Sequence, residues 1–483
     1  MLDDLIRERL KKLEALKKAG YDPYPARVTR THQISEVLKS FPSLAKAKKK
    51  VSVTGRVMGL RKQGGLLFAD LKDESGQIQL VIKKDNLKNF SILAENLDIG
   101  DFAEAGGTLF KTKKGERSIE VKTLRIITKS LRPLPSKWYG LEETETRLRK
   151  RYLDLIAHPE LKELFHKKTL FWEAIRDFMK SEDFLEVETP VLEAVPGGAD
   201  AEPFITHHNA LDVDFYLRIS LEIALKKLMV AGYEKVFEIG RIFRNEGIDA
   251  EHLQDYTQLE FYWAYHDYND LMTLVERLYK EVIKKTFGTL TTSWQGKKIN
   301  WGKKWPRVEY VQVFRELTKI NPLEASRDLL FKKAIAFGIK PDTKLGKGRL
   351  IDLIFKKVVR PTFIQPIFLI NPPVELKPLT KRLESNPKLA ECLHPMAGGT
   401  ELGTGFSELN DPTDQRERFR EQMKLREAGD KEAQRMDEDF LEALEYGMPP
   451  TAGFGVSERL FAVLVDKPVR EVVFFPLMRP RGK

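Results

Sequence analysis

Five short stretches between Val51 and Ile127 constrain the fold of this chain more than any other feature of its sequence. In the first three stretches apolar residues recur at every second position, which is the period of a β-strand with one buried face, and the last two are further candidate strands. The segments QGG and DESG separate the first three stretches and supply the residues that tight turns require. Five short strands joined in this way predict a small β-barrel of the OB type. The predicted strands are 51–60, 66–72, 77–82, 102–111 and 118–127.

The excess positive charge of the chain lies in the same region. The whole chain has a formal net charge of +11. Residues 1–140 hold 29 Lys or Arg against 16 Asp or Glu, whereas residues 141–483 hold 53 against 55. Lys and Arg that neutralise phosphates supply much of the affinity of proteins for nucleic acids. The balance favours an N-terminal module that binds a polyanion, although a surface that merely aids solubility would have the same charge.

Other whole-chain features exclude several classes of protein. No apolar run approaches the roughly 18 residues that a membrane-spanning helix needs, and the start MLDDLIRERLKK has no signal-peptide core. Cys392 is the one cysteine, which excludes a disulfide framework and a multi-cysteine metal site. No GxGxxG follows a strand and no GxxxxGK[ST] is present. We expect a cytoplasmic protein with no membrane contact and no dinucleotide-binding fold.

The rest of the chain alternates helical and strand patterns. Residues 2–19 and 160–182 have the period of amphipathic helices, and the proline-rich segment 131–140, LRPLPSKWYG, is typical of a linker. Later strand patterns with few βαβ alternations favour an antiparallel sheet flanked by helices, so the fold class is α+β. The expected domains are 1–130 with the N-terminal helix and the barrel, 131–150 as a linker, and 151–483.

Residues 243–265, FRNEGIDAEHLQDYTQLEFYWAY, place charges and aromatic rings in a strand–loop–strand unit. A strand that ends in Phe243 and Arg244 would lift Arg244 out of a sheet, and Glu246 comes two residues later, on the same face while the strand lasts. An arginine at a strand end suits a phosphate or carboxylate, which it binds through paired hydrogen bonds. A surface ion pair would use the same residues.

Two further stretches carry unusual patterns. Residues 451–480 begin with TAGFGVSERLF, in which Gly453 and Gly455 would let a flat ligand approach the backbone. A tight strand crossing in a core would need the same glycines. Residues 184–192, FLEVETPVL, predict a strand that enters Pro190, which suits a dimer contact or any sheet edge.

In this order the three stretches resemble the motifs of class II aminoacyl-tRNA synthetases, and longer strings resemble the bacterial type of class II lysyl-tRNA synthetase. The strings are GGADAEPFITHHNALDVDFYLRIS, VFEIGRIFRNEGI, GFSELNDPTDQRERF and EYGMPPTAGFG. The segment 51–82 resembles the OB domain of the same family, and TKSLRPLPSKWYGLEETETRLRKRYLDLI resembles its linker. The resemblance implies an anticodon-binding barrel followed by a class II catalytic domain. It also implies a homodimer that uses ATP and Mg²⁺ to join L-lysine to tRNA(Lys).

The resemblance implies roles for residues in an ATP site. The two catalytic residues, Arg244 and Arg459, would neutralise charge on the phosphates, so no protein nucleophile is needed. Tyr256 and Arg459 would cover the two faces of adenine. Glu401 would bind Mg²⁺, which prefers oxygen ligands. The implied ATP-binding residues are Arg244, Glu246, His252, Tyr256, Glu401 and Arg459.

The same resemblance implies a lysine site. The ε-ammonium group of a bound lysine needs a negatively charged partner in a desolvated pocket. Glu260 precedes Tyr262 by two residues and therefore faces the same side of its strand. A pocket with Glu260 and Glu408 would favour lysine and repel aspartate. The implied lysine-binding residues are Gly198, Glu222, Arg244, Glu260, Tyr262, Phe406 and Glu408.

In the barrel the resemblance implies an anticodon site. Phe68 would stack on a base and Gln79 would hydrogen-bond to it, while Arg61 would contact a base edge or a phosphate. Glu116 is a weaker match. The alternative for Phe68 is a position in the core of the barrel.

Four positions depart from the family pattern. GFGVSER is one residue shorter than the third motif, so we expect a β-bulge if Arg459 is to reach ATP. His394 replaces a glutamate that helps to bind metal, which leaves the number of Mg²⁺ ions open. Glu251 replaces a cation, and Thr404 replaces an asparagine near the substrate carboxylate.

Two other functions stay open at this point. A paralogue that attaches a lysine-like amino acid to a protein would resemble the catalytic domain alone, so the basic barrel argues against it. A pseudoenzyme that binds tRNA or an amino acid would explain the departures. The retained residues Arg244, Glu246, Glu401 and Arg459 argue against that function.

Overall fold

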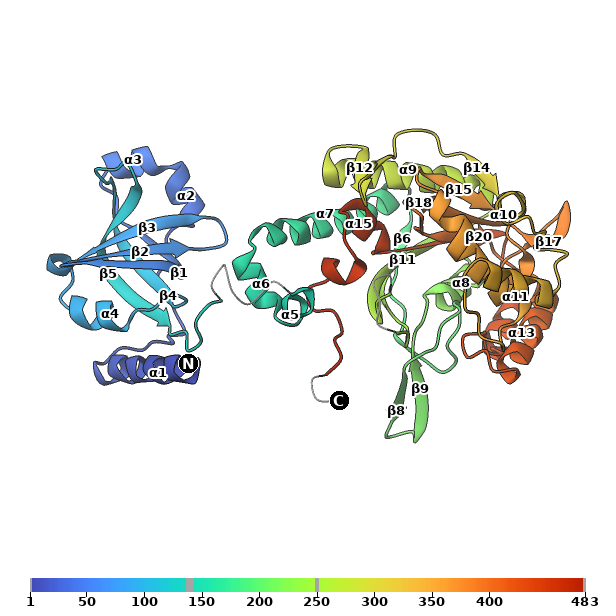
Figure 1. Cartoon of the computed structure of the whole chain (residues 1–483), viewed down its shortest axis with the longest axis horizontal. Helices are drawn as coiled ribbons and strands as arrows, with labels where there is room; N and C mark the ends of the chain where they lie inside the picture. The colour runs from blue at the N-terminus through green and yellow to red at the C-terminus, as the bar shows by residue number, and fades with distance from the viewer. Residues whose placement is uncertain (1, 136–142, 248–251, 481–483) are drawn as a thin grey trace. The chain divides into compact units, whose positions relative to one another are not determined.

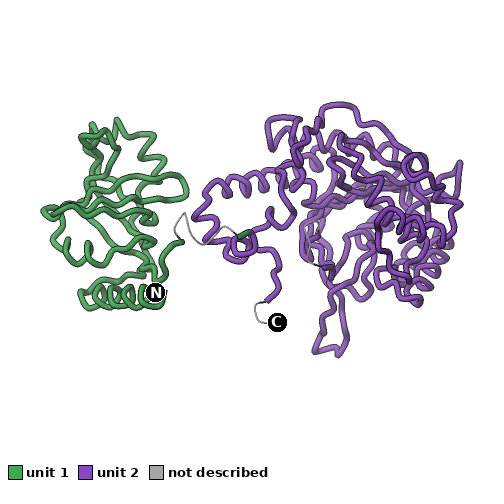
Figure 2. Tube along the Cα trace, viewed as in Figure 1, with its two compact units in different colours: residues 1–143 green, residues 144–483 purple. Residues whose placement is uncertain are grey.

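The computed structural model describes residues 2–135, 143–247 and 252–480. The chain divides into two compact units, residues 1–143 and 144–483 (Figure 2). Residues 136–142 of the predicted linker segment lie outside the described residues. In the described ranges no helix has the length and apolar character needed to cross a membrane.

Unit 1 is a closed five-stranded barrel, as the spacing of apolar residues predicts. The strand order is β1-β2-β3-β5-β4, with β3 and β5 parallel and the other neighbours antiparallel. Alternate residues of each strand point into one core, to which the helices also contribute. The strands are β1(Val51–Gln63), β2(Leu66–Lys72), β3(Gln77–Lys83), β4(Phe102–Lys111) and β5(Arg117–Thr128), and the helices are α1(Leu2–Lys18), α2(Ile34–Lys39), α3(Phe41–Lys46) and α4(Phe90–Asn96).

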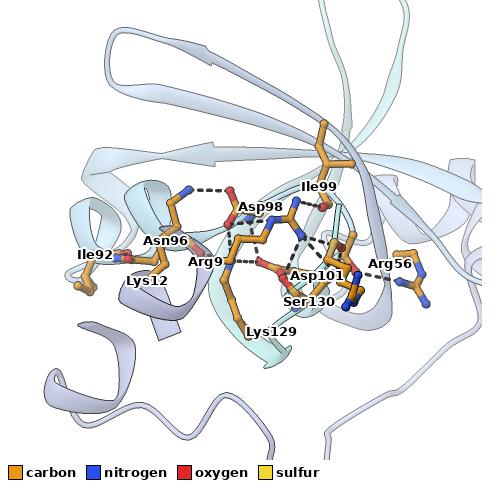
Figure 3. A network of polar contacts seen from close by, with 12 residues as sticks. Arg9, Lys12, Arg56, Ile92, Asn96, Asp98, Ile99, Asp101, Lys129 and Ser130 are labelled. Atoms are coloured by element: carbon orange, nitrogen blue, oxygen red, sulfur yellow. Dashed lines mark hydrogen bonds and ion pairs between the residues drawn. The ribbon is translucent and has the colours of Figure 1, made fainter. Parts of the chain in front are cut away.

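A buried polar network fastens α1 and the end of β5 to the barrel (Figure 3). The Nζ of Lys129, a fully buried side chain, donates to Asp98 Oδ2 at 2.6 Å, to Asp101 Oδ2 at 2.8 Å and to the Asn96 carbonyl at 2.7 Å. Arg9 of α1 donates to the carbonyls of Ile99, Ser130 and Arg132. The network therefore fixes the point at which the chain leaves the barrel.

Unit 2 is built on a nine-stranded sheet of order β14-β15-β18-β20-β21-β11-β10-β6, with β19 beside β18. The predicted antiparallel pairing is confirmed in the centre of the sheet, whereas the edge pairs β14/β15 and β10/β6 are parallel. The strands are β6(Leu185–Glu186), β7(Leu192–Glu193), β8(Ile205–His208), β9(Val213–Leu217), β10(Lys235–Phe243), β11(Asp255–Ala264), β12(Thr291–Trp294), β13(Lys297–Asn300), β14(Arg307–Glu309), β15(Ile367–Ile370), β16(Arg382–Leu383), β17(Asn386–Ala390), β18(Cys392–Ala397), β19(Thr400–Glu401), β20(Thr404–Ser407) and β21(Thr451–Ser457).

Helices cover both faces of this sheet (Figure 1). One core lies between the sheet and α7, α9 and α15, and another lies between the opposite face and α8, α13 and α14. A third core joins α10, α11 and α12 to β15. The helices are α5(Thr144–Arg149), α6(Arg151–Ala157), α7(Glu160–Ser181), α8(Glu222–Val230), α9(Tyr268–Phe287), α10(Tyr310–Thr318), α11(Arg327–Ala336), α12(Lys347–Ile354), α13(Pro412–Glu427), α14(Glu438–Glu445) and α15(Arg459–Leu464).

The prediction of one strand over residues 184–192 is wrong. The segment forms two short strands in different sheets, β6 beside β10 and β7 beside β9. Between them Thr189 leaves the ladder, because its N–H and hydroxyl both donate to Glu238 Oε2 (2.9 and 2.7 Å). Pro190 follows without an N–H to donate. The strand pairing is therefore interrupted by a side-chain interaction that the local pattern does not reveal.

Candidate active site

Alternation along β11 separates the core of unit 2 from a cavity. Leu259 and Phe261 are fully buried in the core beneath α7 and α9, whereas Glu260 and Tyr262 point to the opposite face. The neighbouring strand β21 repeats the pattern, with Phe454 in the same core. One face of the central strands therefore lines a cavity of about 340 Å³, and the other face packs in the core.

All the site residues predicted for the catalytic domain line this one cavity. They come from six separate segments of the chain, so the fold brings together what the sequence holds far apart. They are Gly198, Glu222, Arg244, Glu246, His252, Tyr256, Glu260, Tyr262, Glu401, Phe406, Glu408 and Arg459. Glu251, the predicted departure in the loop before His252, lies outside the described residues.

Arg244 stands directly after the last residue of β10. Its N–H donates to the Gln254 carbonyl at 2.9 Å, which extends the β10–β11 ladder by one residue. Its Nε donates to the Ile219 carbonyl at 3.2 Å, and its guanidinium carbon lies 5.7 Å from the centre of the Tyr256 ring. These contacts aim a cation and an aromatic ring into the same part of the cavity, which suits a phosphorylated, flat ligand.

The β-bulge expected near Arg459 is absent. The register of β21 against β11 and β20 runs without a shift, and Arg459 is the first residue of α15. The buried Glu458 fixes the turn between them, because its carboxylate pairs with Lys168 and accepts the Thr257 N–H at 3.3 Å. A turn into a helix, rather than a bulge, therefore delivers Arg459 to the cavity.

Glu401 lies in the cavity wall beside His394. Its Oε1 accepts a 2.7 Å hydrogen bond from the Thr404 hydroxyl and lies 3.2 Å from His394 Nδ1. Burial alone would raise the pKa of Glu401, but His394, Lys377 and the Thr404 hydroxyl hold that pKa well below its usual range. Glu401 therefore stays an anion, which suits a carboxylate ligand for Mg²⁺.

Both ring nitrogens of His394 face protein groups. Nδ1 lies 3.1 Å from the Thr404 hydroxyl, and Nε2 lies 3.4 Å from the buried Cys392 sulfur. Burial would lower the pKa of His394, but Cys392 and Glu401 raise it to about 9. Throughout the described segments no cluster of three or more His, Cys, Asp and Glu side chains is suited to a metal ion. A metal at Glu401 would thus draw its other ligands from a bound phosphate and water, which suits Mg²⁺.

Glu222, Glu260 and Glu408 form an acidic end of the cavity. Glu260 Oε1 accepts hydrogen bonds from the Ser220 hydroxyl (2.7 Å), the Leu221 N–H (3.0 Å) and Gln258 Nε2 (2.6 Å). Burial raises the pKa of Glu260 and raises that of Glu408 well above its usual range. Three buried carboxylates in one place are costly unless cations balance them.

Two glycines leave room for the acidic end. Gly198 has a φ of +84°, and a Cβ there would stand 2.8 Å from Glu222 Cβ. A Cβ on Gly453 would overlap the Glu408 carboxylate and stand 2.6 Å from the Tyr262 ring. Gly453 therefore makes space for two pocket side chains. The sequence had suggested that it makes space for a flat ligand.

The predicted anticodon residues lie together on the outer face of the barrel. Arg61 pairs with Phe68 across β1 and β2, and Gln79 on β3 lies diagonally from Phe68. Phe68 is half-buried between the core residues Leu67 and Ala69, so the alternative of a core position is wrong. Ser118 donates to Gln79 Oε1 at 3.1 Å, and Glu116 lies two residues before Ser118 in the turn that precedes β5.

Comparison with known proteins decides the family. The family model described as tRNA synthetases class II (D, K and N) matches residues 143–479, and the model described as an OB-fold nucleic acid binding domain matches residues 51–127. The chain belongs to the class II tRNA synthetases.

Relatives of this synthetase cover its whole length. Lysine--tRNA ligase of Roseiflexus castenholzii is 46% identical over 99% of both chains. Lysine--tRNA ligase of Moorella thermoacetica is 44% identical over 99% of this chain and 98% of the relative. Lysine--tRNA ligase of a Thermoanaerobacter species is 45% identical over 100% of this chain and 97% of the relative.

The structure adds residues to the synthetase site that sequence reasoning missed. Ser220, Gln258 and Lys377 also line the cavity, and the first two orient Glu260. The sequence could have predicted Gln258 as a site residue, because it lies two residues before Glu260 and four before Tyr262 on β11 and therefore faces the same side of the strand. Lys377 lies outside any strand or long helix, so no periodic pattern marks it.

Proposed function

We propose that this class II synthetase is a lysine–tRNA ligase. The observation that carries the proposal is the acidic end of the cavity, where Glu222, Glu260 and Glu408 are buried together. An amino acid with two ammonium groups balances such a site, whereas aspartate would add charge of the same sign. Full-length relatives that bear the name Lysine--tRNA ligase agree with this choice.

In the proposed first step the carboxylate of lysine attacks the α-phosphorus of ATP. A phosphorus–oxygen bond forms to the carboxylate, the bond to the β-phosphate breaks, and pyrophosphate leaves. Arg244 and Arg459 neutralise charge that builds up on the phosphates, and Tyr256 supports the adenine ring. Glu246 and His252 complete the ATP contacts. Catalysis rests on position and charge, and no protein nucleophile takes part.

Mg²⁺ would be held by Glu401 together with the phosphates of ATP. Bound there, it would neutralise phosphate charge and help pyrophosphate to leave. Because His394 directs its two nitrogens at Thr404 and Cys392, we propose no metal contact from that side chain.

In the proposed second step a ribose hydroxyl at the 3′ end of tRNA attacks the carbonyl of lysyl-adenylate. The new ester bond forms as the bond to AMP breaks. We propose residues 1–130 as the anticodon-binding domain, 131–150 as the linker and 151–483 as the catalytic domain. Arg61, Phe68, Gln79 and Glu116 would contact the anticodon.

We propose that the enzyme is a homodimer that acts in the cytoplasm. Support for a dimer comes from the strands after α7 and from the hairpin β8–β9, which extends away from the sheet (Figure 1) and exposes 61% of Ile205. Leu185 and Leu192 are also about half exposed. The location is proposed from the reaction, and the free, buried Cys392 suits a reducing compartment. Sedimentation velocity should give the mass of two chains.

Pyrophosphate exchange into ATP tests the proposed function. Each of the twenty amino acids is supplied separately, without tRNA. Exchange with lysine alone is expected. Exchange with another amino acid would overturn the argument from the acidic end, and exchange with none would favour a binding protein without activity.

The affinity for lysine should fall as the pH is lowered. Burial raises the pKa of Glu222 to about 7, with Glu260 adding to the rise and Lys226 opposing it. We propose that Glu222 holds the α-ammonium of lysine, and below this pKa its carboxyl is neutral and loses that attraction. For one group that titrates near 7, the KM for lysine should rise roughly tenfold between pH 8 and pH 6. The KM for ATP serves as the control, and a flat profile for lysine would contradict the prediction.

Phe68→Ala should separate tRNA recognition from amino-acid activation. Loss of one base–aromatic stack costs about 1–3 kcal/mol, which raises the KM for tRNA roughly 5-fold to 150-fold. Exchange without tRNA should stay unchanged. Phe102→Ala is the control, because Phe102 is half-buried at the start of β4 and its ring contacts Arg56. Equal effects of the two substitutions on tRNA would contradict a stacking role for Phe68.

A further inference from the structure

A buried ammonium group lies directly behind the acidic end of the cavity. Lys226 has no exposed side-chain surface and does not line the cavity. Its Nζ lies 2.6 Å from Glu222 Oε1 and forms a second ion pair with Glu408 Oε2. Glu222 and Lys226 are one turn apart on α8, which places them on the same face of the helix.

The contacts of Lys226 fix how Glu408 is presented. Lys226 engages Oε2, while the buried Oε1 has no hydrogen-bond partner among the residues that the structure describes. Oε1 points to the space above Gly453, beside the Tyr262 ring. Besides the two carboxylates, the rings of Phe406 and Phe440 lie near the ammonium, with their centres 5.5 and 5.9 Å from Nζ. Glu408 is thus held by one oxygen and open at the other.

The charges at the acidic end then balance for lysine. Three carboxylates face one resident ammonium, which leaves two negative charges when all three are ionised. Lysine brings two ammonium groups, and Arg244 is proposed to meet its carboxylate. A nearby cation favours the ionised form of a carboxyl group, so an ammonium that enters would stabilise this state. Without Lys226 the end would hold one unbalanced charge or take up a proton.

We propose that Lys226 is a positioning residue that determines specificity for an amino acid with two ammonium groups. It orients Glu408 so that one oxygen meets the ε-ammonium, and it sets the charge of the acidic end to match the substrate. This inference rests on the proposed lysine site. It goes beyond that site because Lys226 acts through Glu222 and Glu408 and touches no substrate.

Lys226→Met in the full chain tests the inference. The KM for lysine in pyrophosphate exchange should rise at least tenfold at pH 7, while the KM for ATP should change less than twofold. The preference for lysine over norleucine, which lacks the ε-ammonium, should fall at least tenfold. General damage to the fold would lower activity with both amino acids equally.

Lys227→Met is the matched control. Lys227 is the next residue on α8, its side chain is 35% exposed, and it pairs with Asp439 outside the cavity. Lys227→Met should leave the KM for lysine, the KM for ATP and the preference for lysine over norleucine within twofold of the parent enzyme. If Lys226→Met does not fold, Lys226→Gln takes its place with the same expectations, because it also removes the charge.

Glu408→Gln separates this inference from the proposed site. A rise in the KM for lysine with Glu408→Gln but not with Lys226→Met would overturn the role of Lys226 alone. An unchanged KM with Glu408→Gln would overturn the lysine site itself. A lower KM for lysine with Lys226→Met would mean that Lys226 competes with the substrate, and would overturn the inference as well.

Discussion

Arg244→Ala should reduce lysine-dependent pyrophosphate exchange by about 10³-fold or more, which is the effect expected for loss of a cation that stabilises a transferring phosphoryl group. The structure gives the reason, because Arg244 follows the last residue of β10 and is held by Gln254 and Ile219 with its charge in the cavity. Binding of tRNA by a filter assay should stay within twofold, since the predicted anticodon residues all lie in unit 1.

Arg241→Ala is the control for this substitution. Arg241 lies three residues earlier on β10, but it is exposed and interacts with Asp255 and Thr257 outside the cavity. Its removal should change exchange less than threefold. A decrease of less than tenfold for Arg244→Ala, or equal decreases for the two arginines, would show that Arg244 does not stabilise the transition state.

Lys129→Met should lower the stability of unit 1 by about 3–5 kcal/mol, because removal of one partner of a buried ion pair leaves an uncompensated charge. Asp101, its partner, has a fully buried side chain, and Asp98 keeps its ion pairs with Lys12 and Arg9. Scanning calorimetry of the full chain should show the transition of the barrel about 10 °C or more lower. Exchange with lysine at 25 °C should be retained, since its predicted residues lie in unit 2.

Lys122→Met supplies the matched control in the same domain. Lys122 lies on β5, the strand that Lys129 follows, but its side chain is 43% exposed and its Nζ lies 3.6 Å from Glu120 Oε1. An exposed pair of this kind contributes about 0–1 kcal/mol. If Lys122→Met and Lys129→Met lowered the transition equally, the buried network would not be what stabilises the barrel.

The parts of the fold that could be predicted are those with long, regular periodicity. The barrel strands and helix α7 agree with the predicted limits to within a few residues. The split of 184–192 into β6 and β7 could not be predicted, because it depends on the contact of Thr189 with Glu238, 49 residues away. The sequence also predicts an amphipathic helix over residues 2–19. In α1 the leucines Leu13 and Leu16 are buried, but Leu2, Leu5 and Leu10 are exposed. Periodicity identifies a helix, but its partners decide how much of the face is covered.

The cavity shows a similar limit. Residues with a motif around them, such as Arg244 and Glu408, were predicted from the sequence and line the cavity. Lys226 was not, because a lysine in a helix is usually exposed to solvent. Its burial follows from α8 packing against the sheet and α14, which is a property of tertiary structure.

The strand pairing around the cavity also determines where the chain tolerates a change in length. Residues 258–263 of β11 are paired on both sides, so one residue gained or lost there would exchange Glu260 and Tyr262 with the core residues Leu259 and Phe261. The turn from Ser457 into α15 is not paired with a strand on both sides. The third motif is one residue short, yet the register of β21 stays intact. Insertions and deletions among homologous sequences should therefore occur mainly at the ends of the central strands. A change in length there alters a turn, but the side chains that line the cavity keep their orientation.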